Sequence, residues 1–279
     1  MANQFKNYLH SLIKGEDLSS SEMGALMSLI MTGKLSSAQI ASCLVAMQIK
    51  GAIPNEIAAA ALVMREHSNK VSVKDSQYLI DTCGTGGDSL QTFNVSTISA
   101  IVAAAAGAKV AKHGGRSVSS KCGSADVLEA LGVDVNLDYK RLGQLVDTIG
   151  IGFMFAPNYH PAMKYVASVR KELEVRTMFN LLGPLTNPAS TSKQVVGVYS
   201  KELTTTFAEV LQKLGSKHVL VVHGEDGMDE ISITGKTFVA ELKDNVVKEY
   251  TIEPSMFNLK VASLEDIIVE SPAHSKKMI

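Results

Sequence analysis

The first 70 residues carry apolar side chains at helical spacing, in short stretches that end at glycine or polar residues. The pattern predicts helices over 3–14, from Ser19 to near Gly33, from Ser36 or Ser37 to near Gly51, and over 56–68 with Asn55 as the cap. Ser19 and Glu22 have the spacing of a capping box. We therefore expect a small all-helical N-terminal domain over residues 1–70.

After residue 71 the pattern changes to short apolar runs separated by helical stretches. The runs are YLIDTC, a short strand within AAGAKVAKHGG, GIGFMFAP, QVVGVYS and HVLVVHGEDG, followed beyond Asp229 by a meander with a turn at Lys243–Asn245. Buried strands that alternate with helices are typical of an α/β layer architecture. We expect residues 71–279 to form a large α/β domain with a central, mostly parallel sheet and surrounding helices. Helices from about 160–190 are expected to join the small domain.

Two further segments give structural expectations. ISAIVAAAA, residues 98–106, is too short to span a bilayer and predicts a buried helix. Ser271 and Pro272 indicate a helix start, yet the sequence stops at Ile279. We expect either a large domain that is C-terminally incomplete or a short terminal helix that docks on it. The amphipathic first fifteen residues do not resemble a signal peptide.

The composition narrows the function classes. The chain has 27 Lys and Arg against 28 Asp and Glu, which argues against a general nucleic-acid binder because such proteins carry a basic excess. Three widely spaced cysteines without a CxxC pair indicate neither a zinc site nor a disulfide framework. We expect a cytoplasmic protein that binds neither nucleic acid nor membranes, so any phosphate binding must be local.

Three glycine-rich or cationic segments predict such a local anion site. GTGGD, residues 84–88, follows a predicted strand and lets backbone N–H groups approach a ligand, although a tight turn explains it about as well. NVST, residues 94–97, opens an apolar helix whose N-terminus suits phosphate, although helix capping alone is the simpler explanation. KHGGRSVSSKCGS, residues 112–124, adds three cations and four serine hydroxyls, which favours an anion site over a solvated loop.

Adjacent carboxylates at Asp229 and Glu230 follow the run VLVVHG. Magnesium prefers a few carboxylates together with water and substrate phosphates. A lone pair of this kind is more often a charged turn, but beside a cationic, glycine-rich pocket it favours a magnesium–polyphosphate site.

Other side chains are weaker candidates. His113 is either a general base or a support for its loop, and Cys122 is more plausibly a packed side chain than a nucleophile. Arg170 and Arg176 suit carboxylate binding, although a surface helix carries arginines for solubility as well.

In this order, GTGGD, NVST, KHGGRSVSSKCGSADVLEALG, RTMFNLLGPLTNP and MDEIS closely resemble the motifs of the anthranilate phosphoribosyltransferase family, from about residue 10 to the end. The resemblance implies a ligand cleft between a small helical and a larger α/β domain, usually in a homodimer. It also implies a pentosyltransferase of tryptophan biosynthesis, which transfers phosphoribose from phosphoribosyl pyrophosphate (PRPP) to the amine of anthranilate with Mg²⁺, two ions accompanying PRPP.

The resemblance assigns residues to three parts of the site. The PRPP contacts would be Gly84, Gly87, Asp88, Thr92, Asn94, Val95, Ser96, Thr97, Lys112, His113, Gly114, Gly115, Arg116, Ser117, Val118, Ser119, Ser120 and Ser124. Ser96, Asp229 and Glu230 would hold magnesium, and Gly84, Gly115 and Arg170 would face anthranilate. No catalytic side chain is expected, because the departing pyrophosphate needs charge stabilisation and the amine needs only positioning.

The sequence departs from the family's motifs at three places. Gly115 replaces the asparagine of Lys-His-Gly-Asn-Arg, which removes a hydrogen bond to anthranilate that is worth about 1.5–3 kcal/mol. Ser168 replaces the proline of Pro-Val-Arg, and Glu174 replaces the glycine of Glu-Leu-Gly. The family also continues beyond the end of this sequence. Two alternatives remain: a related glycosyltransferase or nucleoside phosphorylase with another acceptor, and a catalytically silent nucleic-acid-binding paralogue.

Overall fold

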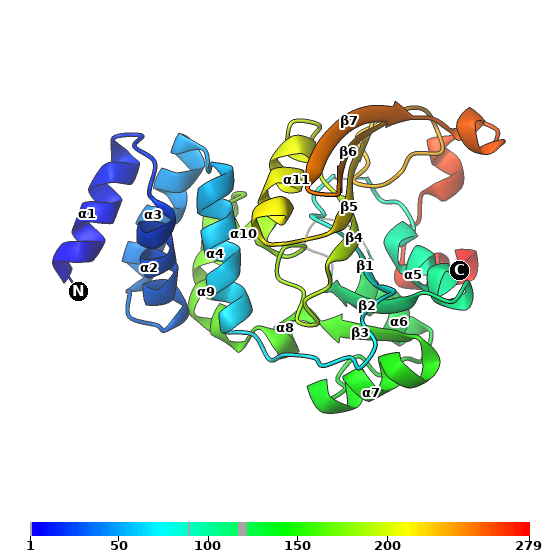
Figure 1. Ribbon diagram of the computed structural model, residues 1–279, viewed down its shortest axis with the longest axis horizontal. Coiled ribbons are helices and arrows are strands. Elements are labelled where there is room, and N and C mark those ends of the chain that lie inside the picture. The colour runs from blue at the N-terminus through cyan, green and yellow to red at the C-terminus, as the bar shows by residue number, and fades with distance from the viewer. Residues whose placement is uncertain (1, 89, 117–121) are drawn as a thin grey trace.

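The computed structural model describes residues 2–88, 90–116 and 122–279, and its N-terminal part is helical (Figure 1). The helices are α1 (Ala2–Ile13), α2 (Ser20–Met31), α3 (Ser37–Lys50) and α4 (Pro54–Glu66). The capping box of Ser19 and Glu22 is present at the start of α2. The prediction of Asn55 as a cap is wrong, because Pro54 takes the first helical position and Ile53 becomes the N-cap.

The strands that the structure describes form one seven-stranded sheet. They are β1 (Leu79–Gly84), β2 (Lys109–Gly114), β3 (Ile151–Phe155), β4 (Lys193–Gly197), β5 (His218–Gly224), β6 (Thr237–Lys243) and β7 (Val246–Ile252). Their order is β3-β2-β1-β4-β5-β6-β7, and the first five in this order run parallel. β6 and β7 are antiparallel additions at one edge. The predicted fold class, a small helical domain and a mostly parallel α/β domain, is confirmed.

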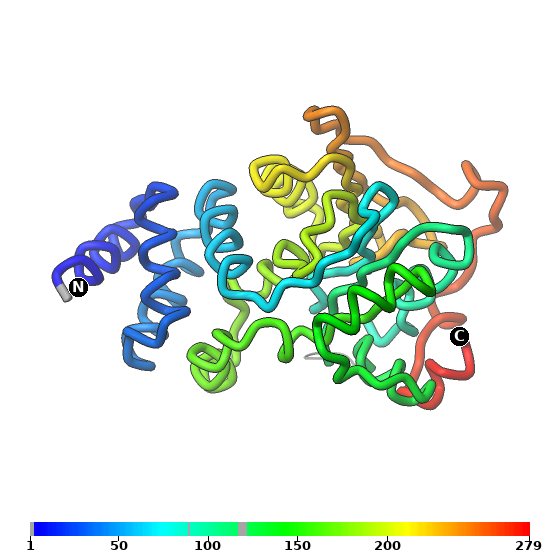
Figure 2. The backbone as a smooth tube through the Cα atoms, turned by 60° about the horizontal axis from the view of Figure 1, so that its bottom comes forward, coloured from blue at the N-terminus to red at the C-terminus, as the bar shows by residue number. Residues whose placement is uncertain are grey.

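Helices cover this sheet and link it to the N-terminal helices (Figures 1 and 2). The other α-helices are α5 (Val95–Ala105), α6 (Ser124–Ala130), α7 (Tyr139–Ile149), α8 (Ala156–Tyr159), α9 (Lys164–Leu173), α10 (Phe179–Leu182), α11 (Leu203–Lys213) and α12 (Pro272–Met278). Short 3₁₀ turns span Pro161–Met163, Pro254–Phe257 and Leu264–Ile267. α11 contacts β5 and β6 on one side and α4 on the other, so it joins the sheet to the N-terminal helices.

α9 and α10 return to the N-terminal helices from the middle of the chain. α9 packs against α2 and α3, and α10 packs against α4. We therefore propose that the small domain consists of residues 1–70 together with helices from about 160–190.

Two sequence expectations require correction. The helix within ISAIVAAAA, α5, covers β1 and β2 with one face, but its other face exposes Val102 at 61%. It is only half buried, because no element of the described chain covers that outer face. The meander reduces to a hairpin: residues 231–236 form no strand, and Asp244 and Asn245 turn the chain with φ of 51° and 61°.

The short helix expected near the end of the sequence is present. α12 has Pro272 in its first turn, and the Ser271 side chain accepts a hydrogen bond from the backbone N–H of His274. It packs against α6. Among the described residues, no helix has the length and apolar character needed to cross a bilayer.

Candidate functional site

A cleft of about 830 Å³ opens at the carboxyl ends of the parallel strands. β1, β2, β4 and β5 all end on a glycine, so backbone can approach a ligand along this edge. The connections run outward in opposite directions from β1 and β4, and such a switch point is the usual ligand crevice of an open α/β sheet. α9 and α10 form the facing wall of the cleft. The fold thus brings segments from four parts of the sequence to one site.

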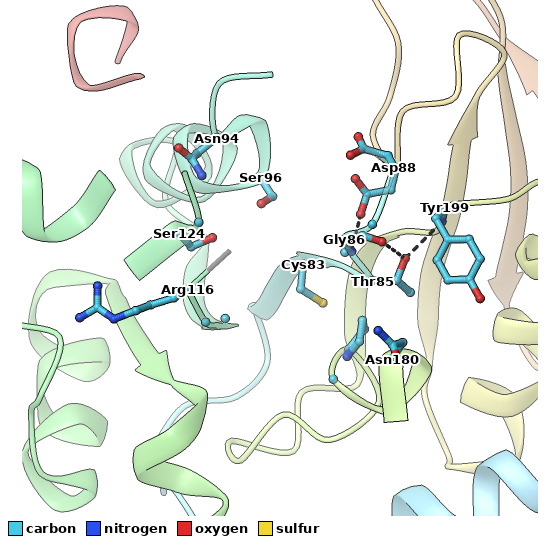
Figure 3. A pocket seen from close by; sticks show the side chains of 18 of the residues that line it. Cys83, Thr85, Gly86, Asp88, Asn94, Ser96, Arg116, Ser124, Asn180 and Tyr199 are labelled. Atoms are coloured by element: carbon cyan, nitrogen blue, oxygen red, sulfur yellow. Dashed lines mark hydrogen bonds between the residues drawn. The ribbon is translucent and has the colours of Figure 1, made fainter. Parts of the chain in front are cut away.

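The glycine-rich loop after β1 is held by backbone and carboxylate contacts (Figure 3). Thr85 N–H donates to Gly197 O at 2.9 Å, and Gly86 N–H donates to Asp229 Oδ2 at 2.8 Å. Gly86 and Gly87 have φ of 65° and 83°, a conformation that favours glycine. The loop is therefore a built part of the site, seated against the carboxylate segment.

An arginine fastens the same loop from the opposite wall. The Arg176 guanidinium donates to Gly87 O and lies over the Tyr199 ring, 4.2 Å from its centroid. Tyr199 N–H in turn donates to the Thr85 hydroxyl at 3.2 Å. Arg176, which was only a weak candidate for carboxylate binding in the sequence, instead supports the loop.

Three carboxyl groups meet beside this loop. Burial, and then the nearby Asp229 carboxylate, raise the pKa of Asp88 to about 7 and that of Glu230 to about 8. Burial also raises the pKa of Asp229. These acids repel one another in a desolvated place, so a divalent cation would stabilise their ionised forms.

The N-terminus of α5 already holds one of these acids. Ser96 N–H donates to Glu230 Oε1 at 3.2 Å, so a carboxyl oxygen occupies the position that the sequence assigned to phosphate or metal. The buried ammonium of Lys112 donates to Thr82 O and, at 3.1 Å, to the Ser96 hydroxyl. Ser96 is thereby held between a cation and a carboxylate.

His113 is buried below the cleft and pairs with a second histidine. Its Nδ1 lies 3.1 Å from Gly183 O, and its Nε2 lies 3.2 Å from Nε2 of His160. Burial and the His160 ring lower the pKa of His113 to about 3. The ring is therefore neutral near pH 7 and too weakly basic to serve as a general base.

Arg116 reaches the cleft rim with its charge already compensated. Its guanidinium donates to Asp126 at 2.8 Å and to both carboxylate oxygens of Glu129, at 2.7 and 2.8 Å. In Figure 3 it points away from Gly86. Its assignment to PRPP stays a prediction that requires a rearrangement of these ion pairs.

Arg170, unlike Arg116, has no ion pair with another described residue. Its guanidinium lies over the Phe179 ring at 5.8 Å from the centroid, and burial lowers its pKa. Within the described ranges, no hydrogen bond or ion pair joins its side chain to another residue. A partly desolvated, unpaired guanidinium in a cleft is suited to bind a carboxylate in a bidentate manner.

Most of the residues assigned from the sequence line this one cleft. They are Gly84, Gly87, Asp88, Thr92, Asn94, Val95, Ser96, Lys112, His113, Gly114, Gly115, Arg116, Ser124, Arg170, Asp229 and Glu230. Thr97 does not: it is buried behind the wall, where its hydroxyl contacts that of Ser124 at 3.1 Å. Ser117, Val118, Ser119 and Ser120 lie outside the described residues.

Several residues that shape the site were not predicted from the sequence. Thr85, Asn180 and Tyr199 line the cleft, and Gly197 seats the Asp229 backbone. Gly197 lies within the predicted strand QVVGVYS, where a lone glycine is a signal for close approach of another backbone. No group of three or more His, Cys, Asp or Glu in the described chain is arranged to hold a metal by itself. A magnesium ion here would need oxygen atoms from a ligand as well.

Two family models match most of this chain. The helical bundle domain of a glycosyl transferase family matches residues 6–68, and the a/b domain of a glycosyl transferase family matches residues 76–279. The anthranilate phosphoribosyltransferase of Methylobacillus flagellatus is 55% identical over 271 residues, which cover 97% of this chain and 80% of that protein. The chain belongs to the anthranilate phosphoribosyltransferase family.

Solved structures of anthranilate phosphoribosyltransferases superpose on the fold. The enzyme of Thermus thermophilus has a TM-score of 0.91 at 44% identity, over 97% of this chain and 80% of its own. The enzyme of Saccharomyces cerevisiae, solved in complex with PRPP and Mg, has a TM-score of 0.90 at 31% identity, over 100% of this chain and 80% of its own. The chain thus spans about four-fifths of the length of these relatives.

Proposed function

We propose that this chain transfers phosphoribose from PRPP to the amine of anthranilate, releasing pyrophosphate and forming N-(5-phosphoribosyl)anthranilate for tryptophan biosynthesis. The observation that carries the proposal is one cleft with two complementary walls. The carboxyl groups of Asp88, Asp229 and Glu230 stand beside the glycine-rich loop, and the unpaired guanidinium of Arg170 stands on the facing helix. One wall suits a magnesium polyphosphate, and the other suits an aromatic carboxylate.

The carboxylate wall would hold magnesium together with PRPP. We assign Asp229, Glu230 and the Ser96 hydroxyl to the ions, of which we propose two, and the donor set fits because it offers only hard oxygen atoms. Bound magnesium would stabilise the negative charge that develops on the departing pyrophosphate. The chain itself keeps this wall in place through the Gly86–Asp229 and Ser96–Glu230 hydrogen bonds. The relative from Saccharomyces cerevisiae, solved in complex with PRPP and Mg, supports magnesium binding together with PRPP.

The acceptor wall would orient anthranilate. We propose that Arg170 binds the carboxylate of the acceptor, with Phe179 beneath the guanidinium and Gly84 and Gly115 at the edge of its space. A related enzyme has been solved in complex with 4-fluoroanthranilate. An aromatic amine is already unprotonated at neutral pH, so it needs orientation towards the ribose carbon and no strong base. The low pKa of His113 agrees with catalysis that depends on position and charge.

The decisive experiment follows anthranilate fluorescence in the presence of PRPP, with and without Mg²⁺. We expect fluorescence to decay only with both PRPP and Mg²⁺, with one pyrophosphate released per anthranilate consumed. Turnover of another aromatic amine but not of anthranilate would overturn the acceptor assignment. Phosphorolysis of a pyrimidine nucleoside without PRPP consumption would instead show a phosphorylase. Arg170→Gln should raise KM for anthranilate without changing the affinity for PRPP, with Arg141→Gln on α7 as a charge-matched control.

We also propose that the chain forms a homodimer through its N-terminal helices. α1 and α3 pack together and expose three large apolar side chains, Ile13 at 67%, Val45 at 37% and Ile49 at 83%. A second copy would bury them, since large exposed apolar side chains on adjacent helices are typical of association surfaces. Light scattering should find a dimer that Ile49→Lys converts to a monomer. Met256→Lys, which changes another exposed apolar side chain, on the 3₁₀ turn Pro254–Phe257, should leave the dimer intact.

A further inference from the structure

Asn94, at the start of α5, has an amide that does not cap its own helix. It occupies the N-cap position, but its side chain makes no capping hydrogen bond. An asparagine at this position ordinarily accepts a hydrogen bond from the first turn of its helix. Another use must therefore explain how this side chain is arranged.

The amide oxygen is held by two donors from distant parts of the chain. The Ser275 hydroxyl, on α12, donates to Asn94 Oδ1 at 2.8 Å, and the Cys122 thiol lies 3.1 Å from the same atom. Burial raises the pKa of the Cys122 thiol, so it stays protonated and able to donate. Ser275 is completely buried, and its oxygen also faces the Asn94 N–H at 3.4 Å.

The amide nitrogen has a different environment. Asn94 Nδ2 donates to Cys122 O at 3.0 Å, which uses one of its two hydrogens. Its other hydrogen has no partner in the part of the chain that the structure describes, and Asn94 lines the cleft. Figure 3 shows the nitrogen on the side nearer Ser124 and the oxygen turned away. The free N–H is thus available to an anion in the donor wall.

The reversed amide orientation is unfavourable at both Cys122 contacts, whereas the Ser275 hydroxyl can donate or accept and does not discriminate between the two orientations. Reversal would place the amide oxygen against Cys122 O, and it would offer the amide N–H to a thiol that is a poor acceptor. It would also present an oxygen atom, with no hydrogen to donate, to a bound phosphate. Cys122 therefore selects one of two orientations that differ in their chemistry towards an anion, and Ser275 anchors the amide oxygen in that orientation.

We propose that Ser275 is a positioning residue for the PRPP site, which acts with Cys122 to hold the Asn94 amide so that its free N–H faces the donor's phosphates. This inference rests on the proposed function for the identity of the anion. The inference connects α12 with the cleft. α12 lies beside α6, and its Ser275 contacts Asn94 at the start of α5 (Figures 1 and 2). Ser275 touches no substrate itself.

Calorimetry with Mg²⁺ and PRPP, and separately with Mg²⁺ and pyrophosphate, tests the inference in the full chain. Ser275→Ala should weaken both affinities by about five- to tenfold, the size of one lost hydrogen bond, and raise KM for PRPP equally. kcat and KM for anthranilate should stay unchanged. Cys122→Ala should act in the same direction, and Cys122→Ser, which keeps a donor, should behave as wild type.

Ser271→Ala is the matched control, because it removes the cap of α12 without touching Asn94. We expect it to lower the melting temperature and leave PRPP affinity unchanged. Equal losses of affinity in Ser271→Ala and Ser275→Ala would reduce Ser275 to a structural role, and unchanged affinity in Ser275→Ala would overturn the inference.

A second readout separates this inference from the proposed function. In protein labelled with ¹⁵N-asparagine, Mg²⁺–pyrophosphate should shift one Asn94 side-chain N–H signal far more than the other, and Ser275→Ala should reduce the size of this selective shift. Equal shifts of both signals in wild type would overturn the inference. Selective shifts in a protein that does not turn over anthranilate would overturn only the proposed function.

Discussion

Gly197, at the end of β4, lies directly against the backbone of Asp229. A Cβ at Gly197 would overlap the carbonyl oxygen of Asp229, and a Cβ at Gly84 would lie 2.5 Å from its Oδ2 atom. The ends of β1 and β4 therefore carry glycine, which lets the Asp229 segment pack directly against the sheet. The position of the proposed magnesium ligands depends on this absence of side chains.

Gly197→Ala should displace the Asp229 segment. We expect a loss of about 1–3 kcal/mol in the free energy of unfolding from overpacking, measured by urea denaturation. Affinity for Mg²⁺–PRPP should fall more than tenfold, because the carboxylates move away from the glycine-rich loop. Gly24→Ala, inside α2 with only a 4.0 Å neighbour, is the control and should bind PRPP normally. Normal PRPP binding by Gly197→Ala would contradict the seating role.

The raised pKa values of the carboxyl groups predict a pH-dependent stability. Asp88 and Glu230 titrate at about 7 and 8 in the folded chain, whereas ordinary carboxyl groups titrate near 4 when it unfolds. Between these values the unfolded chain binds fewer protons, so stability without Mg²⁺ should fall as pH rises from 5 to 8. Mg²⁺ with pyrophosphate should raise the melting temperature more at pH 8 than at pH 5.

Glu230→Gln tests the origin of that slope. It should flatten the decline in stability while weakening Mg²⁺–PRPP binding, because it removes one repelling charge and one proposed ligand. Glu225→Gln, an exposed acid on the same segment, should leave both unchanged. A decline that persists fully in Glu230→Gln would show that other groups cause it.

Substitutions of Gly115 test the proposed anthranilate-binding side of the cleft. A Cβ there meets no atom within 4 Å, so the structure has room for the asparagine of the family's motif. Gly115→Asn should lower KM for anthranilate about tenfold or more by adding a hydrogen bond to a charged group, with KM for PRPP little changed. Gly115→Ala, which fills space without an amide, should leave KM for anthranilate near wild type. Unaltered acceptor affinity in Gly115→Asn would place this residue outside the acceptor contact.

Glu174 holds an unfavourable backbone conformation at the end of α9. It ends α9 in the left-handed conformation, with φ of 51°, where a side chain is unfavourable. Glu174→Gly should raise the free energy of unfolding by about 0.5–1 kcal/mol, and Glu172→Gly, inside the same helix, should lower it by about 1 kcal/mol. Thermal and urea denaturation measure both. Equal destabilisation by the two substitutions would show that the strain at Glu174 is relieved elsewhere.

Local signals predicted most elements because each depends on neighbouring residues. The Ser19–Glu22 capping box, the strand ends at glycine and the hairpin turn at Asp244 and Asn245 all formed as expected. Predictions were wrong where a neighbouring residue competed for the same position or where burial depended on distant elements. Pro54 displaced Asn55 from the cap because its fixed φ and missing N–H suit the first helical position. The apolar pattern of α5 could not reveal which of its faces would be covered.

The sequence by itself determined the two kinds of domain, the anion-binding segments and the family, because those depend on periodicity and on the order of short motifs. Only the tertiary structure decided what the charges do. It paired Arg116 with Asp126 and Glu129, gave Arg170 no hydrogen-bond or ion-pair partner among the described residues, and turned Arg176 into a support for the Gly87 loop. It also brought Ser275 to Asn94 across 181 positions of chain. A guanidinium or amide bonds whatever the fold places within about 3 Å, and sequence separation carries no information about that distance.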